Sequence, residues 1–249
     1  MNTVISIRIG KLITNNKFMT VKQAIITGAA GDLGRAITNA FLSAGYNVHA
    51  IISRRDNKSF INRTGLSVYQ ADLLYETETS SVLKRILDKA KNIDFVIMTV
   101  GGYAPGSLNE VTQTDLEKMF RLNFITAFNV VKSVFPIMEQ QKGDGKLVFI
   151  GARPGLVSEE GTKMVAYTLS KSLVFRLSEI INKVERKNNV KSFVIVPDTI
   201  DTPQNRTAMP DADFTKWVKP ELIAERILNI DKMPDIEKKD NILKIYAGS

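Results

Sequence analysis

A tyrosine and a lysine at helical spacing are the side chains best suited to acid–base chemistry in this chain. They lie in Tyr167-Thr168-Leu169-Ser170-Lys171, and residues four apart share one face of a helix. A nearby ammonium group favours the phenolate and lowers the pKa of the phenol. We therefore expect Tyr167 to pass a proton to or from a substrate oxygen or nitrogen. The spacing alone is common on helices, so its meaning depends on its context.

A glycine-rich turn near the start of the domain supplies that context. The segment Thr27-Gly28-Ala29-Ala30-Gly31-Asp32-Leu33-Gly34 follows a short apolar run and precedes a helical pattern. Glycines permit a tight turn and close approach of backbone N–H groups to a pyrophosphate, and the helix N-terminus adds partial positive charge. The segment predicts a dinucleotide-binding loop, to which Lys171 would add a hydrogen bond to the nicotinamide ribose. The alternative is a turn that holds no ligand.

The choice between NAD(H) and NADP(H) is predicted from the end of the second strand. The chain reads Ser53-Arg54-Arg55 there, and an arginine fork suits a 2′-phosphate. NADP(H) is the preferred cofactor, while NAD(H) stays open because Asp56 is close; the alternative for both arginines is a solvated surface position. Asp72, after the third strand, could accept a hydrogen bond from the adenine amino group.

Strand-like and helix-like segments alternate along the chain. This order predicts a single Rossmann-type doubly wound α/β domain, with a mostly parallel seven-stranded sheet and helices on both faces. The expected strands are Ala24–Thr27, Asn47–Ser53, Leu66–Gln70, Ile93–Thr99, Lys146–Ile150, Val190–Val196 and Ile242–Tyr246. The expected helices are 33–44, Ser80–Lys91, Thr114–Gln140, Thr162–Val184 and Pro220–Leu228, and the irregular stretch Pro197–Lys219 is a candidate substrate lid.

Composition narrows the class of function. With 249 residues, 44% of them hydrophobic, the chain can bury a substantial core. No apolar run is long enough to cross a bilayer, so we expect no membrane partner. The chain has no cysteine and one histidine, His49, in a predicted strand. We therefore expect no metal site and no Ser-His-Asp triad, and the lack of cysteine fits a cytoplasmic location.

The formal net charge of +8 has a partly local origin. Half of the excess comes from Arg8, Lys11, Lys17 and Lys22, which precede any acidic residue. Because the other charges alternate in sign and no aromatic–basic interleaving is present, we expect a small-molecule substrate and no nucleic-acid partner. Residues 1–18 are predicted to be a dispensable extension, with a targeting peptide as the alternative. The domain would then span 19–249.

From about residue 20 to its end, the chain resembles the short-chain dehydrogenase/reductase family. The resemblance rests on the glycine loop, Asn123 in Arg121-Leu122-Asn123-Phe124, Tyr167 and Lys171, which fall in that family's order and spacing. It implies that Asn123 helps to hold a proton-relay water through a local helix distortion. It also implies that Thr202 contacts the carboxamide or phosphate of the cofactor.

Three positions depart from the usual family pattern. Asp32 stands where the common loop has glycine, and Met98-Thr99-Val100-Gly101 replaces an Asn-Asn-Ala-Gly stretch, with Gly101 still expected to border the cofactor. Ala152 aligns with the family's catalytic serine, so an oxyanion partner is missing. Ser158 could replace that serine only if its loop folds inward.

A narrower resemblance, to dihydropteridine reductases, accounts for the alanine. It rests on Val100-Gly101-Gly102-Tyr103, on Gly151-Ala152-Arg153 and on the segment from Asp201 to Trp217. A quinonoid pterin accepts hydride without forming a localised alkoxide, and Tyr103 and Trp217 could stack on a flat ring. The resemblance implies reduction of a conjugated imine or carbonyl substrate. The alternatives are a reductase of ordinary ketones or aldehydes and a non-catalytic NADP-binding regulatory protein.

Assembly is also inferred from the family resemblance. Members usually pair through the two long helices, which predicts a homodimer, with a homotetramer as the alternative. The side chains that could form this seam could equally face the sheet. They are Ala127, Val130, Val131 and Val134 on one helix and Leu173, Val174 and Leu177 on the other.

Overall fold

A computed structural model describes residues 21–54, 63–184, 190–233 and 241–246. Seven strands form one sheet in the order β3-β2-β1-β4-β5-β6-β7, and every neighbouring pair is parallel. The fold is therefore the predicted doubly wound Rossmann-type α/β domain. The strands are β1 (Gln23–Thr27), β2 (Asn47–Ile52), β3 (Leu66–Gln70), β4 (Phe95–Met98), β5 (Gly145–Ile150), β6 (Val190–Pro197) and β7 (Ile242–Ile245).

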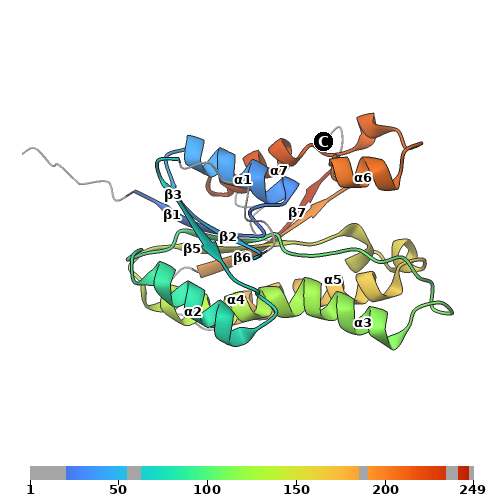
Figure 1. The fold of residues 1–249 in the computed structure, drawn as a ribbon, viewed down its shortest axis with the longest axis horizontal. Coiled ribbons are helices and arrows are strands. Elements are labelled where there is room, and N and C mark those ends of the chain that lie inside the picture. Colours follow the sequence, from blue (N-terminus) through green and yellow to red (C-terminus); the bar gives the residue numbers. More distant parts are fainter. Residues whose placement is uncertain (1–20, 55–62, 185–189, 234–240, 247–249) are drawn as a thin grey trace, which may run out of the picture.

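Helices cover both faces of the sheet (Figure 1). On one face lie α1 (Asp32–Ser43) and α7 (Pro220–Leu228), which pack against each other. On the other lie α2 (Glu76–Leu87), α4 (Thr126–Gln140) and α5 (Val165–Lys183). Each layer buries its own apolar cluster against the sheet. Because both faces are covered, the central strand β4 is buried along its whole length.

The predicted helix over 114–140 is one continuous helical segment with a distortion inside it. It consists of α3 (Gln113–Phe120), a π-helical turn η1 (Arg121–Ile125) and α4. Thr112 begins α3 with a capping box in which its hydroxyl accepts from the Asp115 amide. A π-turn inserts one residue into the helical repeat, and such turns are frequent at functional sites. The distortion expected from the family resemblance is therefore present at Asn123.

Several predicted boundaries were wrong. The helix expected over Ser80–Lys91 is α2, which begins earlier, at Glu76. The prediction missed this start because the polar first turn lacks the apolar residues on which periodicity depends. The helix expected from Thr162 begins at Val165, after η2 (Arg153–Gly155) and η3 (Ser158–Gly161), because Met164, the residue before it, forms a bridge with Gly106. The strand expected over Ile93–Thr99 is the shorter β4.

The stretch 197–219, predicted to be irregular, contains α6 (Pro203–Ala208) and η4 (Phe214–Lys216). Thr202 caps α6, and Pro203 occupies its first turn, a position in which the missing amide of proline costs nothing. His49 is buried in β2 beside Gln23, and burial lowers its pKa. Among the described residues, no helix is long and apolar enough to span a membrane. Residues 1–18 and Arg55 lie outside the described residues.

Candidate active site

The glycine turn between β1 and α1 has the geometry of a ligand-binding loop. Gly28 adopts a φ of +60°, which L side chains rarely adopt, and a Cβ there would lie 2.7 Å from Thr99 Oγ1. At Gly34 a Cβ would collide with the carbonyl oxygen of Gly28. None of the described side chains caps α1, whose N-cap is Gly31. The first N–H groups of the helix therefore face the turn without a side-chain acceptor.

The other residues of this turn have different surroundings. Thr27 is buried, and its carbonyl oxygen accepts from Thr99 Oγ1 at 2.7 Å. Asp32 is exposed in the first turn of α1, and Leu33 packs against the core beneath that helix. The turn is therefore held by the hydrogen bond from Thr99, which follows β4, and it is exposed to solvent at Asp32.

Lys171 lies near the ends of β4 and β5, in the part of the site that carries the predicted catalytic residues. Its side chain is buried in α5, and its Nζ donates to the carbonyl oxygen of Ile150, at the end of β5, at 2.8 Å. Burial lowers the pKa of Lys171 to about 8. A Cβ added at Gly101 would lie 3.4 Å from this Nζ and 2.7 Å from Asn123 Oδ1. The glycine at position 101, in the segment after β4, therefore leaves room beside the backbone for these two side chains.

Tyr167 lies one turn before Lys171, with the lysine Nζ 5.8 Å from its ring centroid. Its ring contacts that of Tyr103 edge to face, with centroids 5.3 Å apart, and 60% of Tyr103 is exposed. Burial, with a smaller contribution from Tyr103, raises the pKa of Tyr167 to about 12. The expectation that Lys171 depresses this pKa was wrong, because desolvation of the phenolate outweighs the ammonium at this separation.

Asn123 is buried in η1, and its side-chain amide holds the chain around it in place. Its Oδ1 accepts from Gly102 N at 2.8 Å, and its Nδ2 donates to Gly102 O at 3.0 Å. The same Nδ2 donates to Ser170 Oγ at 2.9 Å, and Ser170 Oγ in turn donates to Tyr167 O at 2.7 Å. Asn123 therefore links the loop after β4 to the helix that carries the tyrosine. Sequence reasoning missed Ser170 because nothing in its spacing predicts this partner.

Ala152 is buried at the end of β5, where the family pattern has serine. Ser158 is exposed in η3, so the inward-folding alternative finds no support. The neighbouring Arg153 forms ion pairs with Glu160 at 2.5 Å and Asp198 at 3.1 Å. Sequence reasoning missed this cluster because Asp198 lies at the end of a different strand.

The carboxyl ends of β2 and β3 bring the predicted adenosine-binding residues together. Ser53 and Arg54 are exposed directly after β2. Arg54 Nη2 lies 3.1 Å from Glu78 Oε2, and that oxygen also accepts from the Asp72 amide at 3.0 Å. Asp72 Oδ1 accepts from Leu74 N at 3.0 Å. Glu78 was not predicted, because an acidic residue in the first turn of a helix usually serves only the helix dipole.

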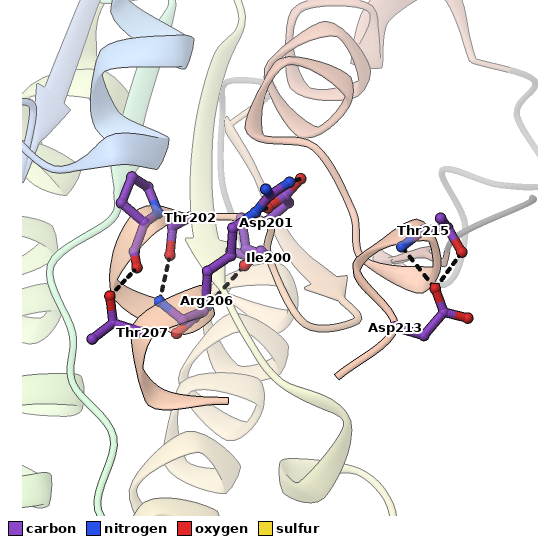
Figure 2. A network of polar contacts seen from close by, with 9 residues as sticks. Ile200, Asp201, Thr202, Arg206, Thr207, Asp213 and Thr215 are labelled. Atoms are coloured by element: carbon purple, nitrogen blue, oxygen red, sulfur yellow. Dashed lines mark hydrogen bonds and ion pairs between the residues drawn. The ribbon is translucent and has the colours of Figure 1, made fainter. Parts of the chain in front are cut away.

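The loop after β6 is tied down by polar contacts (Figure 2). Thr202 Oγ1 accepts from Asn205 N at 3.2 Å, and Arg206 forms two bonds to Asp201, at 2.6 and 2.8 Å. The Trp217 ring contacts Phe214, with centroids 4.7 Å apart. Thr202 is therefore held in place as the N-cap of α6. The Trp217 ring packs against Phe214 of the same loop.

These residues suit a dinucleotide cofactor in three respects. The turn after β1 is open to a pyrophosphate, a guanidinium lies at the end of β2, and a buried ammonium lies beside a glycine that follows β4. All three lie at carboxyl ends of parallel strands, where ligands bind in doubly wound sheets. Within the described residues, no group of acidic or histidine side chains is arranged to hold a metal ion.

Comparison with known proteins identifies the family to which the chain is similar. The model of the short chain dehydrogenase family matches residues 22–213. Dihydropteridine reductase of Dictyostelium discoideum is 26% identical over 86% of this chain and 90% of its own length. The 3-oxoacyl-[acyl-carrier-protein] reductase of Thermotoga maritima is 25% identical over 83% and 89%.

Solved structures share the fold at lower identity. Aldohexose dehydrogenase of Thermoplasma acidophilum has a TM-score of 0.74 at 18% identity, over 90% of this chain and 92% of that one. A Burkholderia thailandensis oxidoreductase of the short chain dehydrogenase/reductase family has a TM-score of 0.77 at 19% identity, over 91% of each chain. With a matching sheet, glycine turn and family model, this chain belongs to the short-chain dehydrogenase family of NAD(P)H-dependent oxidoreductases.

Proposed function

We propose that the chain is an NADP(H)-dependent reductase of a flat, conjugated imine or carbonyl substrate, of which a quinonoid dihydropterin is the leading candidate. The observation that carries this proposal is the contact of the largely exposed Tyr103 with the ring of Tyr167, taken together with the buried alanine at position 152. An aromatic ring at the proton donor favours a planar substrate. The absence of a hydroxyl at Ala152 favours a substrate that forms no localised alkoxide.

The cofactor, when bound, supplies the hydride. Gly28, Gly31 and Gly34 would admit its pyrophosphate, and Ser53 and Arg54 at the end of β2 would hold the 2′-phosphate of NADP(H). Arg55 would add a second guanidinium. NAD(H) remains an alternative cofactor, since Arg54 is already paired with a carboxylate.

Tyr167 is the proposed proton donor. With its pKa raised to about 12, the phenol is protonated at neutral pH and can donate as the substrate is reduced. Lys171 would hydrogen-bond the nicotinamide ribose. Asn123 would hold the loop after β4 in place and, through η1, a relay water. Asp72 and Thr202 would contact the adenine and the carboxamide or phosphate, and Gly101 would border the nicotinamide.

A second candidate is a reductase of ordinary ketones or aldehydes. Its support is the similarity to a bacterial 3-oxoacyl-[acyl-carrier-protein] reductase, which is nearly as strong as that to dihydropteridine reductase. In that case Tyr167, Lys171 and Asn123 would act without a serine hydroxyl.

The test is NADPH oxidation by the purified full chain with quinonoid dihydropterin, repeated with NADH and with a panel of quinones and ketones. Turnover of the pterin that is faster with NADPH supports the proposal. Turnover of ketones with little activity on the pterin supports the second candidate. An Ala152→Ser variant sharpens the choice, since restoring the hydroxyl should help ketones more than pterin.

The proposed assembly is a homodimer, with a homotetramer as the alternative. The seam residues predicted on α4 are buried in the core against the sheet, as is Val174, and Leu177 packs against this core. These residues therefore cannot form the contact between two copies. The outward face instead carries a row of aromatic rings, Phe120, Phe124 and Phe128, with successive centroids 5.3 and 5.9 Å apart. On α5, Leu169, Leu173 and Ile180 are exposed. An apolar face of this kind favours pairing of two copies.

The proposal also covers the role of residues 1–18 and the location of the protein in the cell. We infer a dispensable extension before a domain that spans 19–249, and a cytoplasmic location consistent with the absence of cysteine.

A further inference from the structure

An ion pair lies at the adenosine end of the proposed site. Arg54 Nη2 lies 3.1 Å from Glu78 Oε2, and the same oxygen accepts a hydrogen bond from the Asp72 amide at 3.0 Å. Arg54 follows β2, Asp72 follows β3, and Glu78 lies in the first turn of α2. One carboxylate therefore joins the two strand ends at which the adenosine is proposed to bind.

Glu78 is the anchored member of this pair. Its side chain is 33% exposed, whereas that of Arg54 is 70% exposed. The Asp72 amide and the N-terminus of α2 both stabilise its negative charge. To bind another anion, Arg54 must therefore either leave the Glu78 carboxylate or contact both anions at once.

The geometry of arginine makes Glu78 and a 2′-phosphate compete for the same nitrogen atom. A guanidinium grips a phosphate with two parallel N–H groups, either from both Nη atoms or from Nε and Nη2. Both arrangements use Nη2, the nitrogen in contact with Glu78. A carboxylate here also repels a 2′-phosphate, whereas it can accept a hydrogen bond from the 2′-hydroxyl of NAD(H).

We propose that Glu78 determines cofactor specificity: it competes with the 2′-phosphate for Arg54 and so keeps the site open to NAD(H) as well as NADP(H). This inference rests on the proposed NADP(H) site at Arg54. It assigns to α2 a control over cofactor choice that acts through Arg54, the residue at the end of β2.

The test is equilibrium binding of NADPH and NADH to the full chain by calorimetry, at low ionic strength, without substrate. Glu78→Gln keeps an oxygen that can accept from the Asp72 amide while removing the charge. We expect the ratio of NADH to NADPH dissociation constants to rise about three- to tenfold, the size of an interaction between partly exposed charges.

Glu76→Gln is the matched control. Glu76 lies in the same first turn of α2 but pairs with Lys132 on α4 at 2.6 Å. The Glu76→Gln substitution removes the same charge from the same helix end without affecting the contact to Arg54. The ratio of NADH to NADPH dissociation constants should therefore stay at the parent value. An unchanged or lower ratio in Glu78→Gln, or an equal rise in Glu76→Gln, would overturn the inference.

Arg54→Ala separates this inference from the proposed function. If this variant loses affinity for NADPH more than for NADH, the proposed 2′-phosphate site stands, and Glu78→Gln then tests Glu78 alone. If it changes both dissociation constants equally, the NADP(H) site itself is wrong and the inference falls with it. In the Arg54→Ala background, the effect of Glu78→Gln should shrink to the part that comes from direct repulsion of the 2′-phosphate, and an effect as large as in the parent would contradict the competition for Arg54.

Discussion

The buried ammonium of Lys171 predicts a stability that rises in alkaline solution. Burial lowers the pKa of this lysine from 10.5 to about 8 in the folded chain. Below pH 8 the group is charged in both states, so the folded state carries the whole desolvation cost. Between pH 8 and 10.5 the folded state loses the proton first. Because the unfolded state then binds more protons, the free energy of unfolding increases with pH.

The magnitude follows from the two pKa values. Their difference corresponds to about 3 kcal/mol, of which about 2.5 kcal/mol is recovered between pH 7 and pH 10. Lys171→Met keeps the length of the side chain and removes the charge, so it removes this pH dependence. It also removes the donor to Ile150 O, which costs about 1 kcal/mol at every pH.

The assay is urea unfolding of both proteins at several pH values from 7 to 10. The free energy of unfolding of the parent should rise by about 2.5 kcal/mol relative to Lys171→Met over this range. Lys183→Met, at an exposed position of the same helix, is the control and should follow the parent. Parallel curves for the parent and Lys171→Met would refute the reasoning, because they would mean that Lys171 is not desolvated.

Three further predictions concern the turn, the assembly and the N-terminus. Gly34→Ala should lower the free energy of unfolding by about 1–3 kcal/mol, measured in urea, because its Cβ meets the Gly28 carbonyl; at Gly31 a Cβ has only an ordinary contact of 3.5 Å, so Gly31→Ala should be milder. Phe128→Asp should convert a dimer to monomers in sedimentation, and a dimer that persists would contradict the proposed face. Deleting residues 1–18 should leave NADPH affinity and solubility unchanged, and insoluble protein would contradict this.

The seven strands and their parallel sheet could be predicted from the sequence because buried parallel strands are short apolar runs between turn signals. Helix starts were harder to predict. The first turn of α2, Glu76 to Thr79, has only polar residues, so the apolar period begins only after the helix does. The π-turn at Asn123 was expected only from the family resemblance, because a single change of phase in one apolar pattern does not by itself identify a π-turn.

The residue types of the site could be predicted, but their electrostatics could not. Spacing places Tyr167 and Lys171 on one face, yet the direction of the tyrosine pKa depends on how deeply the phenol is buried. The pairing of Arg54 with Glu78 joins residues on different elements, as does that of Arg153 with Asp198. Such pairs depend on the packing of the sheet and its crossovers, which a single sequence does not encode as a local pattern.

The central claim is that Tyr167 donates the proton in an NADPH-dependent reduction. Its most direct test is a Tyr167→Phe variant, with NADPH binding and steady-state turnover of quinonoid dihydropterin measured on the same preparation. The account predicts an NADPH dissociation constant close to that of the parent and a turnover lower by about 10²–10⁴-fold, the range for loss of a general acid. Turnover equal to that of the parent, with binding intact, would contradict the assignment of Tyr167 as the proton donor.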